Sequence, residues 1–297
     1  MPWVQITLHT DPQHSTALED MLLLCGAGAV TMLDGADQPV FEPIKGTTPL
    51  WQDTRIMGLF DAETDGDALL SYLRTGWQEQ FSDTDFPRYK LEILEDKDWV
   101  REWMDRFEPV QFGNRLWVCP SWKPVPDASA ANLMLDPGLA FGTGSHPTTA
   151  LCLQWIEQQE WQGKRAIDYG CGSGILGLAA LLLGAQQVLG VDNDEQALLA
   201  TRDNAQRNHI DPDHMPVFLP HNAPREEVDI MLANILAGPL MDLSQTLAEL
   251  TKSGGLITLS GILEHQAKEV IAAFTPWFDM HTVTQQDEWV RIDGSKR

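Results

Sequence analysis

The chain has 297 residues, of which 43% are apolar and 21% are charged. This composition is that of a soluble globular protein, and it excludes disorder, collagen, coiled coils and small disulfide-stapled scaffolds. Acidic residues outnumber basic ones by 43 to 20, for a formal net charge of -23. A field of this sign repels a phosphate backbone, so we expect no direct nucleic-acid binding. The acidity either keeps the protein dispersed or favours a basic partner.

The chain shows no signal for a membrane or a metal. It has no run of about 18 apolar residues and no basic N-terminal segment followed by an apolar one, so we expect no membrane span, no signal peptide and a cytoplasmic location. The cysteines are scattered, without the spacing of metal ligands. We therefore predict no metal site and four free thiols, at Cys25, Cys119, Cys152 and Cys171.

The first ninety or so residues alternate between short strand and helix patterns in the order β-α-β-β-α-β. This order predicts a small ferredoxin-like α+β sandwich, a fold that often serves in recognition but does not identify a ligand. Glycine, proline and polar residues predict a long loop at 34–53. The predicted strands are 3–8, 29–33, 55–60 and 89–94, and the predicted helices are 15–24 and 67–77.

Residues 96–108 have the pattern of an amphipathic helix. Apolar side chains recur there at spacings of three and four residues until Pro109 ends the pattern. The segment lies between two differently organised parts of the chain, so it is a candidate linking helix, although its aromatic residues would also suit ordinary core packing. We predict a domain at 1–95, a linking helix at 96–109 and a second domain at 110–297.

From residue 164 onward, strands and helices alternate regularly, which predicts a doubly wound parallel α/β sheet. Its last two strands have no helix between them and should form an antiparallel hairpin. Ligands of such sheets bind at the carboxyl ends of the strands. The seven predicted strands are 165–168, 187–191, 217–219, 228–233, 256–260, 278–283 and 288–292, and the helices between them are 175–183, 194–208, 236–250 and 263–274.

A glycine-rich loop follows the first strand of this sheet, with the sequence DYGCGSG at 168–174. Glycines let the backbone turn sharply and approach a ligand, and the apolar helix that follows offers unpaired N–H groups at its N-terminus. The loop therefore predicts a cofactor site; the alternative is a tight turn that binds nothing. Cys171 within it is explained by its small size.

Two cofactor classes fit this loop. Residues 172–177 match the GxGxxG fingerprint of dinucleotide-binding folds. Asp192, at the end of the second strand, would reach the ribose hydroxyls of a dinucleotide or of an adenosyl cofactor, while Asp194 is the better candidate to cap the next helix. These residues do not decide between the classes.

Two further features favour methyl transfer. Asn234 ends the fourth strand, where its amide and a nearby backbone carbonyl can accept hydrogen bonds from an amine and turn its lone pair toward a methyl group. Taken alone, such an Asn is more often a turn residue. Upstream, the glycine-rich segment 136–149 precedes a predicted helix at 149–158 and could cover the cofactor, which a dehydrogenase would not need. We interpret His146 in that segment as structural.

These motifs resemble those of class I S-adenosylmethionine-dependent methyltransferases: 168–174 is similar to the cofactor loop, 190–194 to the acidic ribose motif and 234–236 to the substrate motif. The segments 135–149, 233–240 and 253–263 more closely resemble the ribosomal protein L11 methyltransferase family, PrmA, from about residue 98 to the end. The resemblance implies a seven-stranded Rossmann-like methyltransferase domain preceded by the ferredoxin-like domain, which would recognise the substrate.

The resemblance also implies residue roles. The S-adenosylmethionine contacts would be Thr149, Gly170, Gly172, Asp192 and Asn234, with Asn234 also the catalytic residue that faces the amine. The substrate would be ribosomal protein L11, methylated on its N-terminal α-amine and on lysine ε-amines, and we expect a monomeric enzyme. The Asn-Ile-Leu motif lacks the aromatic residue that stacks a flipped base in DNA adenine methyltransferases.

Three alternatives remain open. A nicotinamide-dependent dehydrogenase would share the fold and would bind NADH. A methyltransferase of another protein or of a small-molecule amine would share every catalytic motif, although the latter would have less use for the N-terminal domain. A binding module would hold the cofactor without turnover, which the presence of Asn234 disfavours.

Overall fold

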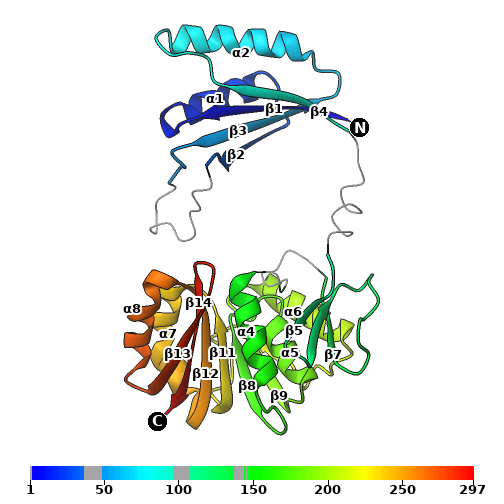
Figure 1. Ribbon diagram of the computed structural model, residues 1–297, viewed down its shortest axis with the longest axis vertical. Coiled ribbons are helices and arrows are strands. Elements are labelled where there is room, and N and C mark those ends of the chain that lie inside the picture. The colour runs from blue at the N-terminus through cyan, green and yellow to red at the C-terminus, as the bar shows by residue number, and fades with distance from the viewer. Residues whose placement is uncertain (1, 37–48, 96–106, 137–143, 145) are drawn as a thin grey trace. The chain divides into compact units, whose positions relative to one another are not determined.

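The computed structural model describes residues 2–36, 49–95, 107–136, 144 and 146–297 (Figure 1). The chain divides into two compact units, Met1–Met104 and Asp105–Arg297. The division falls inside the predicted linking segment, of which residues 96–106 lie outside the described residues, while 107–109 have no helical structure. Most of the glycine-rich segment before the 149–158 helix, namely 137–143 and 145, also lies outside them.

The N-terminal unit has the predicted β-α-β-β-α-β order, which is confirmed. Both helices begin at aspartates, Asp11 and Asp65, whose carboxylates accept hydrogen bonds from backbone N–H groups of the first turn, as is typical of N-caps. The elements are β1 (Trp3–Thr10), α1 (Pro12–Leu24), β2 (Ala29–Asp34), β3 (Thr54–Asp61), α2 (Gly66–Gln80) and β4 (Tyr89–Leu94).

The strands of this unit form an antiparallel sheet of order β2-β3-β1-β4, with α1 and α2 on one face (Figure 1). Alternate residues of β1 and β3 point toward the helices and are buried, as the two-residue period of a strand requires. The core of the unit includes Val4, Ile6, Leu8, Leu18, Leu22, Ile56, Phe60, Leu73 and Trp77.

The C-terminal unit begins with a small sheet that the sequence did not predict. It consists of β5 (Val110–Phe112), β6 (Leu116–Cys119) and β7 (Ala131–Met134), with β5 antiparallel and β7 parallel to β6. Its strands have only three or four residues, which is too short for a recognisable period. The sheet packs on the larger core through Leu116 and Leu133.

In the described part of the chain, a seven-stranded sheet of order β10-β9-β8-β11-β12-β14-β13 forms the centre of the C-terminal unit. The pairs from β10 to β12 are parallel, and β14 and β13 add antiparallel strands, so the predicted doubly wound sheet and its terminal hairpin are confirmed. The strands are β8 (Arg165–Tyr169), β9 (Gln187–Val191), β10 (Val217–Phe218), β11 (Val228–Asn234), β12 (Thr251–Leu263), β13 (Phe278–Gln286) and β14 (Trp289–Lys296).

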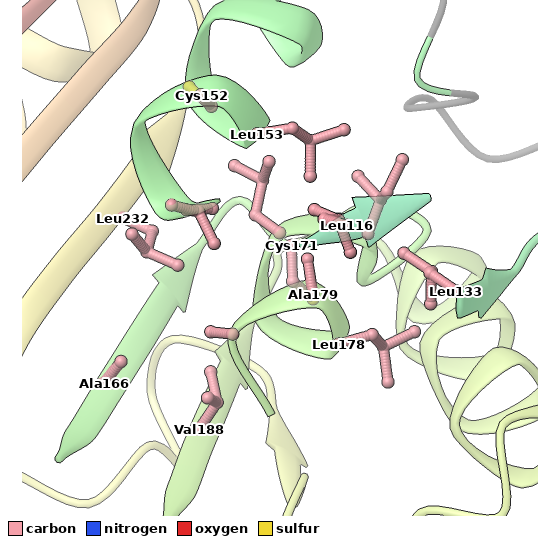
Figure 2. Close-up of a cluster of buried hydrophobic side chains, with 14 of the residues drawn as sticks. Leu116, Leu133, Cys152, Leu153, Ala166, Cys171, Leu178, Ala179, Val188 and Leu232 are labelled. Atoms are coloured by element: carbon pink, nitrogen blue, oxygen red, sulfur yellow. The ribbon is translucent and has the colours of Figure 1, made fainter. Parts of the chain in front are cut away.

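Helices cover both faces of this sheet. On one face, α4 (Pro147–Gln158), α5 (Ile175–Leu182) and α6 (Glu195–Arg207) pack on side chains such as Val188 and Leu232 (Figure 2). On the other face, α7 (Ala237–Glu249) and α8 (Ala267–Phe274) pack on side chains such as Ile167 and Met231. Each buried strand therefore contributes alternate residues to two cores, which explains its continuous apolar sequence.

Several bounds differ from the prediction, most of all those of β12. The strand expected at 256–260 begins at Thr251 and continues to Leu263, and a short 3-10 turn, η1 (Glu264–Gln266), precedes α8. The register of β12 against β14 shifts between Leu259 and Ile262, where Gly261 has a φ of 83°. A glycine tolerates this conformation and lets the strand resume its pairing after the irregularity. The helix expected from 263 therefore begins later.

Candidate functional site

The three loops singled out in the sequence meet at one edge of the seven-stranded sheet. Strand β8 pairs with β9 up to Tyr169 and Val191, and with β11 up to Asp168 and Leu232. Because these strands are parallel, the residues that follow them lie together at their carboxyl ends. The glycine loop, Asp192 and Asn234 are thus brought into one site.

The glycine loop between β8 and α5 uses conformations that other residues rarely adopt. The φ angles of Gly170, Gly172 and Gly174 are 82°, 54° and 80°, all in the left-handed region. The loop is tied to β9 because the N–H of Gly170 donates to the carbonyl of Val191 at 2.7 Å. Its sharp turn brings the loop backbone and the N-terminus of α5 to the sheet edge, where glycine allows close approach of the backbone to a ligand.

Asp192 lies directly beside this loop. One carboxylate oxygen, Oδ2, accepts a hydrogen bond from the N–H of Gly172 at 2.9 Å, and Oδ1 accepts one from the N–H of Asp194 at 3.0 Å. Asp194 itself caps α6 by accepting from the N–H of Gln196. The expectation that Asp194 caps this helix is confirmed. The carboxylate of Asp192 therefore remains at the edge of the sheet.

Asn234 is the last residue of β11, and Thr149 lies in the first turn of α4. The amide Nδ2 of Asn234 donates to Oγ1 of Thr149 at 3.4 Å, across 85 residues of sequence. Among the residues that the structure describes, no group donates to the buried Oδ1 of Asn234. A buried acceptor without a donor costs about 1–3 kcal/mol, so its position indicates a ligand that supplies the donor.

The segment Asn234–Ile235 is held between two glycines. A Cβ atom on Gly170 would lie 2.1 Å from Cγ2 of Ile235, and one on Gly261 would lie 2.3 Å from the carbonyl oxygen of Ile235. Both positions therefore require glycine, and together they fix where Asn234 ends its strand. No role is predicted for Gly261, because the predicted strand ends at residue 260; within the observed strand, a glycine is typical of a bulge or a close approach.

Asp168, at the end of β8, is a further polar residue of the site that the sequence analysis used only as part of the loop motif. Its side chain is buried; Oδ2 accepts from the N–H of Gly177 at 2.9 Å, and Oδ1 has no partner in the described part of the chain. Burial raises the pKa of Asp168 to about 7; the hydrogen bond from Gly177 opposes this rise and the negative charge of Asp192 adds to it.

His146 and Cys171 have the structural roles expected of them. His146 is the N-cap of α4, where its ring accepts from the N–H of Thr148 and stacks edge-on against Trp289 at 5.1 Å, and burial lowers its pKa. Cys171 is buried beneath the glycine loop, and burial raises the pKa of its thiol, which disfavours the reactive thiolate.

The described residues contain neither a candidate membrane span nor a candidate metal site. No helix among them has the length and apolar character needed to cross a membrane. No group of three or more His, Cys, Asp or Glu side chains within them is arranged to hold a metal ion.

The site fits an adenosyl cofactor. Asp192 presents a carboxylate beside a glycine loop, and the buried Oδ1 of Asn234 has no donor among the residues that the structure describes. A doubly wound sheet of this strand order, with a glycine loop after its first strand and an amide after its fourth, defines a methyltransferase with a Rossmann-like fold.

Comparison with known proteins identifies the family within this class. Residues 2–297 match the family model described as ribosomal protein L11 methyltransferase (PrmA). The chain therefore belongs to the PrmA family, and its cofactor is S-adenosylmethionine.

Several relatives match over their full length. The ribosomal protein L11 methyltransferase of Azotobacter vinelandii is 54% identical over 100% of both chains, and that of Marinobacter nauticus is 53% identical over 100% of this chain and 99% of its own. Among solved structures, the ribosomal protein L11 methylase of Lactobacillus delbrueckii subsp. bulgaricus has a TM-score of 0.59 and 29% identity, covering 64% of this chain and 100% of its own.

Proposed function

We propose that this chain methylates ribosomal protein L11, on the N-terminal α-amine and on lysine ε-amines. The relatives that match the whole chain carry this protein in their names, and the described site offers an acceptor for an amine. The net charge of -23 supports the proposal, because an acidic enzyme attracts a substrate that bears lysines and forms complementary contacts with it.

The observation that carries the proposal is the buried Oδ1 of Asn234. Bound S-adenosylmethionine supplies an electrophilic methyl group for in-line displacement by nitrogen. Oδ1 of Asn234 accepts a hydrogen bond from the substrate amine and so fixes the direction of the nitrogen lone pair. Thr149 accepts from Nδ2 of the same amide, which keeps Oδ1 directed away from the helix and toward the site.

The amine must be uncharged before it can react. An unperturbed lysine has a pKa of about 10.4, so the ammonium form dominates at neutral pH. An amine bound against the half-buried side chains of Asn234 and Ile235 loses part of its hydration, which favours the neutral form. Asp192 is part of the cofactor side of the site through its bond to Gly172, and we assign it to the ribose hydroxyls.

The remaining assignments belong to the same proposal. Thr149, Gly170, Gly172, Asp192 and Asn234 contact the cofactor, and the enzyme acts as a cytoplasmic monomer without direct nucleic-acid binding. Residues 1–95 form a ferredoxin-like substrate-recognition domain and residues 110–297 the catalytic domain, and the segment 96–109 links the two. The strand order β2-β3-β1-β4, with both helices on one face, supports the ferredoxin-like assignment.

Intact-mass spectrometry of purified ribosomal protein L11, incubated with the enzyme and S-adenosylmethionine, tests the substrate. We expect mass gains of one methylene each on this protein and none on an unrelated lysine-rich protein, and fragmentation should place them on the N-terminus and on lysines. Equal gains on both proteins, or gains on a small-molecule amine only, would contradict the substrate assignment and leave family and cofactor unchanged.

The variant Asn234→Ala tests the role of the amide. We expect methyl transfer to fall by about 100-fold or more, because orientation of the nucleophile is lost, and cofactor affinity to fall by less than about tenfold. Single-turnover rates and calorimetric binding measure the two quantities. Asn132→Ala is the control. Asn132 lies in β7 of the small sheet, and its half-buried amide donates to the carbonyls of Asp127 and Ala130. Equal losses of rate and affinity in Asn234→Ala would remove the assigned role.

A further inference from the structure

One face of α6 carries three polar side chains, Thr201, Asn204 and Asn208, which we call the α6 polar stripe. Their spacing of three and four residues places them in line on one side of the helix. Thr201 is fully buried, with 0% exposure, and Asn204 is 7% exposed. Polar groups buried to this degree are costly unless each has a partner, so the partners of the stripe indicate what it does.

Two members of the stripe bind consecutive carbonyl groups of the glycine loop. Oγ1 of Thr201 donates to the carbonyl of Gly172 at 3.0 Å, and Nδ2 of Asn204 donates to the carbonyl of Ser173 at 2.9 Å. The methyl group of Thr201 also packs closely on Gly174, since a Cβ atom on this glycine would lie only 2.8 Å from it. Oγ1 of Thr201 also donates to Sγ of Cys171 in the same loop, at 3.4 Å. The loop therefore rests on α6 through these hydrogen bonds and one close apolar contact.

These bonds act on the most flexible backbone of the site. Gly170, Gly172 and Gly174 all have positive φ, and glycine loses more conformational freedom on ordering than any other residue. A peptide unit is planar, and its C=O and N–H groups point in opposite directions. Fixing the carbonyls of Gly172 and Ser173 on α6 therefore directs the N–H groups of Ser173 and Gly174 away from that helix, and the N–H of Gly174 donates to the carbonyl of Cys171 at 2.7 Å.

The other end of the stripe holds α6 itself in place. Oδ1 of Asn208 accepts from the N–H of Met134 at 2.7 Å, and Nδ2 of Asn208 donates to the carbonyl of Met134 at 2.8 Å. These two hydrogen bonds have the same pattern as the backbone bonds between two paired strand residues. They attach α6 to the end of β7. The same Nδ2 also donates to the carbonyl of Asn204 at 2.8 Å, which links the two asparagines.

We propose that Thr201 and Asn204 are positioning residues for S-adenosylmethionine binding, which act by holding the glycine loop in its cofactor-binding conformation. The proposal rests on the assignment of the loop to the cofactor. When the loop loses one of these hydrogen bonds, it adopts the binding conformation for a smaller fraction of the time. The apparent affinity for S-adenosylmethionine falls in proportion to that fraction. Once cofactor is bound, the loop is held by the ligand, so the rate of the chemical step changes little.

The test is a pair of variants at position 201, measured in the full chain. Thr201→Val removes the hydroxyl and keeps the shape of the side chain, whereas Thr201→Ser keeps the hydroxyl. We expect Thr201→Val to raise the Kd for S-adenosylmethionine about three- to tenfold, the equivalent of one neutral hydrogen bond, with kcat at saturating cofactor within about twofold of wild type. Thr201→Ser should restore most of the affinity.

Thr251→Val is the matched control. Thr251 is also fully buried, and its hydroxyl donates to a helix carbonyl, that of Leu247, at the start of β12 and away from the loop. The Thr251→Val variant should have a melting temperature lowered about as much as that of Thr201→Val, and its Kd for S-adenosylmethionine should be unchanged. An unchanged Kd in Thr201→Val, or an equal rise in Kd in both variants, would overturn the proposal. Failure of the wild-type chain to bind S-adenosylmethionine would instead refute the cofactor assignment of the loop.

Discussion

The two edges of the seven-stranded sheet are built differently. At the carboxyl edge, Asp168 and Asn234 each have a buried oxygen without a hydrogen-bond partner among the described residues, and the glycines of the loop have positive φ angles that other residues rarely adopt. At the amino edge, the carboxylate of Asp229 accepts from the N–H of Arg165 and from Nζ of Lys252, both at 2.9 Å. The polar groups of the amino edge stabilise the fold, whereas the carboxyl edge is the one that we propose to bind the ligand.

The pKa values of Asp168 and Asp229 are shifted in opposite directions, in line with this difference between the edges. Burial raises the pKa of Asp168 to about 7. Burial also acts on Asp229, but the hydrogen bonds from Arg165 and Lys252 and the charge of Lys252 outweigh it and lower the pKa of that carboxyl below 3.8. An ionised Asp168 therefore destabilises the folded chain at neutral pH, and an ionised Asp229 stabilises it.

The largest effect expected from breaking the carboxyl edge is that of Gly170→Ala. The new Cβ would clash with Ile235 and would stand at a φ of 82°, so we expect a loss of about 2–4 kcal/mol in the free energy of unfolding. Displacement of Ile235 also moves Asn234, so cofactor affinity should fall more than tenfold. Urea denaturation and calorimetric binding measure the two effects.

Gly254→Ala is its control near the amino edge. Gly254 also has a positive φ, of 74°, but a Cβ there would meet nothing within 4 Å. This variant should lose only about 1–2 kcal/mol, from backbone strain, and keep its cofactor affinity. If both variants bound the cofactor equally well, the close approach of Gly170 to Ile235 would not matter for the site.

Asp168→Asn should have the next largest effect, and its sign depends on pH. Since the pKa of Asp168 is higher in the folded chain than in the unfolded one, its contribution to stability is full below about pH 4 and is lost as pH rises toward 7. The neutral amide avoids this loss. We expect the stability of the variant relative to wild type to increase by about 1–3 kcal/mol between pH 4.5 and 7.5 without cofactor. A constant difference across this range would show that Asp168 does not titrate there.

Asp229→Asn should have the smallest effect and the opposite pH dependence. The stabilising contribution of the ionised Asp229 is present above pH 3.8 and is lost as pH falls through its lowered folded-state pKa. We expect the variant to be about 1 kcal/mol less stable than wild type at pH 7 and nearly equal to it near pH 2.5. Chemical denaturation at both pH values measures this. If the variant were more stable than wild type at pH 7, ionised Asp229 would not stabilise the fold, and the two edges would not differ in this way.

Much of the site could be predicted because its residues follow strands in the sequence. The glycine loop, Asp192 and Asn234 each come directly after a periodic apolar run, and parallel strands bring such positions together. Asp194 could be recognised as a cap from its place before a helical pattern. The short strands β5 to β7 could not be found, because three or four residues do not establish a period.

The sequence by itself determined the element order of the N-terminal unit and of the seven-stranded sheet, the cofactor loop and the family resemblance, since these depend on local periodicity and on motifs. Only the tertiary structure decided that Asn234 meets Thr149, that Gly261 presses on Ile235 and that Thr201 and Asn204 support the loop. These contacts join residues about 25 to 85 positions apart, and such distances are set by how strands and helices pack rather than by any local pattern.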